Sequence, residues 1–150
     1  MQFSTYQLVL FPVEPDKGLT VERLHECLQP LGLLGQELGN SRYAVGEAFL
    51  SLLCFLGCSP DIELEPHADK AFCYVQLPED ATPVDFHLIR KPVISVTSWV
   101  IIGNIHEVEA VPNAALLSAL EAASGGRWKY AYRLADGAFC SSALSAGTAL

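Results

Sequence analysis

The chain has 150 residues, of which 51% are hydrophobic and only 17% are charged, and its formal net charge is −8. This composition is typical of a compact globular protein and argues against a disordered one. The acidic balance argues against binding to nucleic acids or to anionic membrane surfaces, because both require basic side chains. A basic partner protein is compatible with it, since opposite charges speed association.

The N-terminal stretch MQFSTYQLVLFPVEP lacks the basic start of a signal peptide and instead predicts a strand over residues 3–13. Apolar residues lie on both faces of this strand, which indicates an interior position in a sheet. No apolar run is long enough for a transmembrane helix. The five cysteines follow no disulfide spacing, so we expect mostly free thiols and a cytoplasmic protein.

The next two segments are predicted as a short helix and a loop. Thr20 is the expected N-cap of a helix over residues 21–29, and Pro30 is expected to end it. The run LGLLGQELGNSR follows, and its glycines predict an irregular linker of about a dozen residues.

The strongest apolar run in the chain is YAVGEAFLSLLCFLGC, residues 43–58. Apolar side chains would lie on nearly every face of a helix here, so we predict a buried central helix around residues 43–57. Helical spacing would bring four chemically active or polar side chains onto one stripe of it. These are Glu47, Ser51, Cys54 and Cys58.

Beyond Pro60 the pattern alternates between apolar and polar residues, which predicts a series of strands. The strands are expected over residues 61–65, 72–77, 84–89, 93–102 and 105–111. A last helix is predicted over residues 113–124, with Pro112 in its first turn and Gly125 closing it. The final strand, RWKYAYR, places its three aromatic residues on one face, which is typical of a core strand with a solvated outer face.

This order of elements predicts the fold class. Strands that are grouped along the chain favour an antiparallel α+β fold over an alternating parallel one. We expect a mainly antiparallel twisted sheet of five to seven strands with about three helices, including the central apolar helix. Residues 1–134 are expected to form a single α+β domain, and residues 135–150, rich in Ala, Ser and Gly, a weakly ordered tail.

Two groups of residues are candidates for a metal-binding or catalytic site. Zinc prefers four soft or imidazole ligands, and the candidate ligands here are Cys54, Cys58, His67 and Cys73. The alternative function is therefore a small metal-binding or thiol-dependent enzyme centred on Cys54 and Cys58, with zinc as its cofactor. Only one close cysteine pair exists, however, and buried free cysteines explain the pattern more simply. Asp85 and His87 share a strand face and would suit general acid–base chemistry, but an ordinary half-exposed strand face is the preferred explanation.

The preferred interpretation is a protein-binding accessory or immunity-type module with no catalytic activity of its own and no cofactor. Its partner would be another protein, of basic charge, and a second copy of the chain is the other partner considered. The expected binding residues are acidic side chains on strand edges and turns. They are Asp61, Glu63, Glu65, Glu79 and Asp80.

Overall fold

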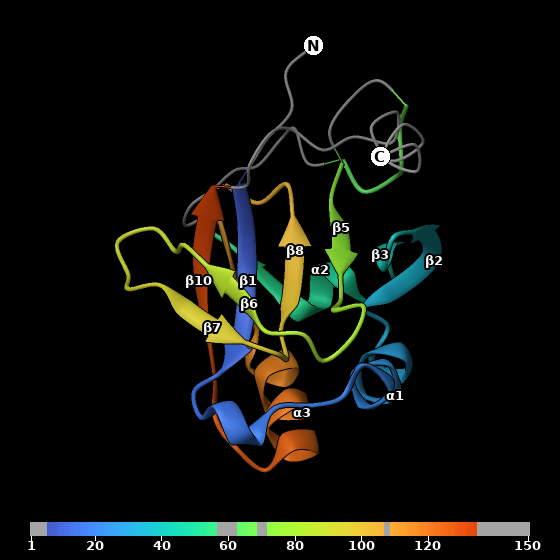
Figure 1. Ribbon diagram of the computed structural model, residues 1–150. Helices are drawn as coiled ribbons and strands as arrows, with labels where there is room; N and C mark the ends of the chain where they lie inside the picture. The colour runs from blue at the N-terminus through green and yellow to red at the C-terminus, as the bar shows by residue number, and fades with distance from the viewer. Residues whose placement is uncertain (1–5, 57–62, 69–71, 107–108, 135–150) are drawn as a thin grey trace.

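The computed structural model describes residues 6–56, 63–68, 72–106 and 109–134 (Figure 1). The described chain forms an α+β fold with three α-helices and a mainly antiparallel sheet. The elements in chain order are β1 (Tyr6–Pro12), the 3-10 helix η1 (Pro15–Lys17), α1 (Val21–Leu31), β2 (Leu34–Gly39), β3 (Arg42–Val45), α2 (Phe49–Leu52), β4 (Leu53–Phe55), β5 (Tyr74–Gln76), β6 (Val84–Phe86), β7 (Ile94–Val96), β8 (Val100–Gly103), β9 (Ala110–Pro112), α3 (Ala114–Ser124) and β10 (Trp128–Leu134).

Six strands form the main sheet in the order β10-β1-β8-β5-β3-β2, and each neighbouring pair is antiparallel. Two separate antiparallel pairs, β4–β9 and β6–β7, lie outside it. The predicted fold class, with its antiparallel sheet and about three helices, is confirmed. Within the described ranges, no helix has the length and apolar character needed to cross a membrane.

The main sheet carries a hydrophobic core on each face. We call the larger one the helix-side core, because Leu24, Leu28, Leu116 and Leu120 of α1 and α3 belong to it. The smaller one, the hairpin-side core, is covered by the β6–β7 pair, which Figure 1 shows in front of β1. Strand β1 alternates between the two: Leu8 and Leu10 enter the helix-side core, and Val9 and Phe11 the hairpin-side core. Its predicted interior position is confirmed.

Helices α1 and α3 form close to their predicted ranges, and each begins after a capping side chain. Thr20 Oγ1 accepts a hydrogen bond from the Arg23 amide at 3.1 Å, and Asn113 Oδ1 accepts one from the Ala115 amide at 2.6 Å. Gly125 ends α3 in the left-handed conformation (φ 76°). Pro30 does not end α1, which continues to Leu31. The helix stops at Gly32 (φ 87°), whose amide closes the last turn on Gln29 and Leu28.

The predicted central helix around residues 43–57 is wrong. Its first residues belong to strand β3, a single helical turn forms α2, and the chain then continues directly into strand β4. Gly46 explains the break, since its amide bonds to the Leu33 carbonyl at 2.8 Å and a Cβ on it would collide with the Gly32 carbonyl. The apolar side chains of residues 43–57 therefore belong to several short, buried elements. The periodicity of apolar residues alone does not distinguish such a series of short elements from one buried helix.

The predicted linker after α1 is also wrong, because it forms the β2–β3 hairpin. Asn40 and Ser41 both have positive φ, 54° and 61°, as the two central residues of a type I′ hairpin turn require. Strand β2 lies at the edge of the sheet, where polar Gln36 and Glu37 remain exposed. An edge strand can carry polar, solvent-exposed residues, so the composition of β2 resembles that of a loop.

The long strand expected over residues 93–102 is two strands, β7 and β8, which belong to different sheets. The chain turns between them at 97–99, where the buried Ser98 side chain bonds to the Leu19 amide. Pro112 ends strand β9 instead of starting α3. The predicted weakly ordered tail, 135–150, lies outside the described residues.

Candidate functional site

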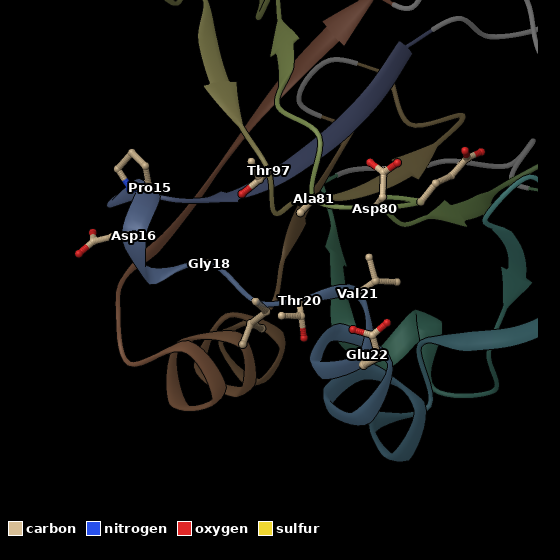
Figure 2. Close-up of a pocket in the computed structure, with 11 residues that line it drawn as sticks. Pro15, Asp16, Gly18, Thr20, Val21, Glu22, Asp80, Ala81 and Thr97 are labelled. Carbon is tan, nitrogen blue, oxygen red and sulfur yellow. The ribbon is translucent and has the colours of Figure 1, made fainter.

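A cavity of about 470 Å³ lies between the start of α1 and the loop after β5. Its walls come from Pro15, Asp16 and residues 18–22, from residues 79–81, and from Thr97, which follows β7. Figure 2 shows Val21 and Glu22, at the start of α1, across the gap from the turn that carries Asp80 and Ala81; the Asp80 carboxylate points away from α1, and Asp16 projects away from both. Two segments more than fifty residues apart in sequence therefore form one concave surface.

The first wall is held by a close backbone approach. Gly18 packs against Ser98 so tightly that a Cβ on it would lie 2.7 Å from the Ser98 Cβ. The next residue, Leu19, is buried, and its amide donates to Ser98 Oγ at 2.9 Å. Thr20 then caps α1, so the first turn of this helix begins directly at the cavity. Small and capping residues thus fix both the position and the direction of the wall.

The opposite wall is a turn that orders a carboxylate. Asp80 Oδ1 accepts a hydrogen bond from the Thr82 amide at 2.9 Å, as in an Asx turn. Hydrogen bonds from the side chain and amide of Thr82 lower the pKa of Asp80 below its ordinary value. Asp80 is fully exposed, so its carboxylate is ionised at neutral pH and available to a ligand.

The cavity is strongly acidic. Four carboxylates, those of Asp16, Glu22, Glu79 and Asp80, belong to residues that line it, and none of its lining residues is Lys, Arg or His. Within the described ranges, no salt bridge is recorded for any of these four. Glu79 is the one with a cation close by. Burial lowers the pKa of Arg42, and the charge of Glu79, after the Tyr74 side chain, counteracts part of this shift.

A second, smaller cavity of about 210 Å³ shares Glu79 and Asp80 with the first. Trp99 lines it together with residues 76–80, Thr82 and Val84. The indole ring stands edge-on to Phe86 in the hairpin-side core, with ring centroids 5.4 Å apart and an interplanar angle of 84°. The two cavities therefore meet at the Glu79–Asp80 turn.

The structure divides the predicted binding residues between the two ends of β5. Glu79 and Asp80 follow the strand and line both cavities. Glu63 lies before it, with its carbonyl accepting from the Cys73 amide at 2.8 Å and its side chain 3.2 Å from His67 Nε2. Glu65 is exposed beside Glu63. Asp61 lies outside the described residues.

The predicted metal ligands do not form a cluster in the part of the chain that the structure describes. Cys54 is exposed on β4, His67 contacts Glu63, and Cys58 lies outside the described ranges. Cys73 is buried and its thiol donates to the Asn104 carbonyl at 3.8 Å. Burial, with smaller contributions from Glu109 and Glu63, raises the pKa of Cys73 to about 12. This thiol is protonated at neutral pH, whereas metal ligation and nucleophilic attack both need a thiolate.

Within the described residues, no group of three or more His, Cys, Asp or Glu side chains is placed to hold a metal ion. The cavity residues that sequence reasoning missed are Asp16, Glu22 and Trp99. Thr20 was predicted only as a helix cap, and no local pattern indicates that it lines the same cavity as Asp80.

The chain was compared with known proteins at three levels. No protein-family model, no curated protein and no solved structure matches it. The function of the chain is therefore inferred from the chemistry of the two cavities.

Proposed function

We propose that this protein is a binding module that takes a basic segment of another protein into the cavity between residues 15–22 and 79–81. The observation that carries the proposal is the composition of that cavity. It is about 470 Å³ in volume and lined by four carboxylates without a cationic side chain among its lining residues. Arginine and lysine side chains of a partner are the natural complement of such a surface.

The start of α1 favours a peptide over a bare cation. The first amides of a helix have no partner within the helix, and this end carries a partial positive charge that repels cations. Thr20 satisfies the Arg23 amide, and the amides of Val21 and Glu22 remain available at the cavity wall. A basic peptide offers carbonyl oxygens to these amides and a cationic side chain to Asp80, so one segment complements both features.

The overall charge supports the same role. A formal net charge of −8 attracts a basic partner over several ångströms and speeds the encounter. In this role the protein acts by occupying a surface of its partner, as an accessory or immunity-type protein does, and performs no chemistry itself.

The test measures binding of a fluorescently labelled, capped Gly-Arg-Gly-Arg peptide by anisotropy. Affinity should fall at least about tenfold as salt is raised from about 10 mM to about 1 M, because the screening length shrinks from roughly 30 Å to 3 Å. The double variant Glu22→Gln with Asp80→Asn should bind at least about fivefold more weakly at low salt, because it removes two of the four carboxylates that line the cavity.

The matched control is Glu65→Gln, which removes an exposed carboxylate near the other end of β5. It should weaken binding much less than the cavity variant, because Glu65 lines neither cavity. Equal losses in the control and in the cavity variant would mean that net charge alone attracts the peptide. An affinity that is independent of salt would also contradict the proposal.

A further inference from the structure

Trp99 has a buried hydrogen-bond donor that no described residue satisfies. The side chain is only 6% exposed, and its Nε1 has no partner within the described ranges. The other tryptophan, Trp128, is equally buried, but its Nε1 donates to Ser124 Oγ at 2.9 Å. Native proteins rarely leave a buried donor without an acceptor, so we expect the Trp99 N–H to have an acceptor outside the described residues.

The position of this donor relates it to the candidate site. Trp99 lines the smaller cavity, and Glu79 and Asp80 line both cavities. A ligand held at Asp80 in the larger cavity therefore reaches the cavity of Trp99 by crossing the Glu79–Asp80 turn. Trp99 and the carboxylates therefore line adjoining cavities.

The ring of Trp99 is held in place by packing. It stands edge-on to Phe86 and belongs to the hairpin-side core with Val96 and Ile101. A ring fixed in this way presents its N–H in one direction and cannot turn to find another acceptor. The acceptor has to be brought to it.

We propose that the indole N–H of Trp99 donates a hydrogen bond to a carbonyl oxygen of the bound basic segment. This proposal rests on the proposed function and narrows its ligand class to a polypeptide, because a simple polyamine carries cations but no carbonyl. The N–H is closed to solvent in the free protein, so the residues that cover it have to move when the segment binds.

The experiment compares two probes on the ¹⁵N-labelled full chain, the capped Gly-Arg-Gly-Arg peptide and the tetraamine spermine. Both should bind at low salt, and Asp80→Asn should weaken both. Only the peptide should move the Trp99 indole N–H signal to the frequency of a hydrogen-bonded indole. The Trp128 indole signal serves as the internal reference and should stay in place, because its N–H is already bonded to Ser124.

The variant Trp99→Phe retains an aromatic ring against Phe86 and removes the N–H. It should weaken peptide binding about fivefold, which corresponds to one hydrogen bond, and leave spermine binding unchanged. Trp128→Phe is the matched control and should not change the ratio of the two affinities. If Trp99→Phe does not fold, the Trp99 indole signal of the unmodified protein still tests whether the hydrogen bond forms.

The two proposals fail in different ways. If both probes bind through Asp80 but the Trp99 signal does not move, the hydrogen bond is absent and the binding function stands. If neither probe binds, the proposed function is wrong and the role of Trp99 falls with it. If spermine moves the Trp99 signal as the peptide does, the N–H responds to the carboxylates and not to a carbonyl.

Discussion

Gly103 lies directly beneath the aromatic ring of Tyr74, its cross-strand partner on the neighbouring strand. The ring occupies the space that a Cβ on Gly103 would need. Gln7 Nε2 donates to the Tyr74 hydroxyl at 2.7 Å, and the Arg42 guanidinium lies 5.9 Å from the ring centroid. The ring is therefore held at its hydroxyl and over its face, where strands β5 and β8 join the two halves of the main sheet.

Gly103→Ala should therefore destabilise the protein strongly. The added methyl group would force the Tyr74 ring or the strand to move, and overpacking of this kind typically costs about 1–3 kcal/mol and occasionally more. Urea unfolding measures the change in the free energy of unfolding. In a Tyr74→Ala background the same substitution should cost less than about 1 kcal/mol, because the obstacle is gone. An equal cost in both backgrounds would show that the ring is not the cause.

The turn that orders Asp80 should control the titration of its carboxyl group. Its pKa is lowered in the folded protein, so its hydrogen bonds to Thr82 are fully formed above the pKa of an unfolded Asp and are lost as pH falls through the lower folded value. Thr82→Val removes the hydroxyl donor and should move the Asp80 midpoint upward, and Thr82→Ser should retain the lowered value. Carboxyl ¹³C NMR gives the midpoints, and identical midpoints in all three proteins would contradict the assignment.

The two thiols of the predicted metal site that lie within the described residues should differ widely in reactivity. Cys54 is exposed, whereas Cys73 is 1% exposed and has a pKa raised to about 12. A short iodoacetamide pulse at about pH 8 should alkylate Cys54 and leave Cys73 unmodified, because the thiolate is the reactive form. Peptide mapping by mass spectrometry identifies the modified residue.

The same pulse in urea should modify both residues, which controls for the intrinsic reactivity of Cys73. The raised pKa also has a consequence for stability. The protonated thiol stabilises the folded state fully below about pH 9, and this contribution is lost as pH rises towards 12. Equal labelling of both residues in the native protein would contradict the burial of Cys73.

The parts of the fold that were predicted correctly are those with local signals. Thr20 and Gly125 mark helix ends within a few residues of the contacts they make. Strand β1 was predicted in the interior of the sheet because both of its faces are apolar. A strand that is covered on both faces packs apolar side chains on each of them. The segment at 43–57 failed because its apolar residues serve three different elements, and no local signal separates them.

The candidate site was only half predictable for a related reason. Glu79 and Asp80 were selected because acidic residues in a turn are visible in the sequence. Their counterparts on the other wall become neighbours only through the contact between Gly18 and Ser98, which are eighty positions apart in the chain. That contact depends on backbone shape and close packing, which leave no residue pattern to recognise.

The β6–β7 pair forms no ladder hydrogen bonds with the main sheet and is attached chiefly through the small hairpin-side core. A unit held by few buried contacts opens at a lower free energy than the sheet on which it packs. We therefore expect the β6–β7 pair to open more readily than the main sheet, and Trp99 lies in the core between them. A ligand that contacts both layers would limit their relative motion, so occupancy of the site and order in the hairpin would rise together.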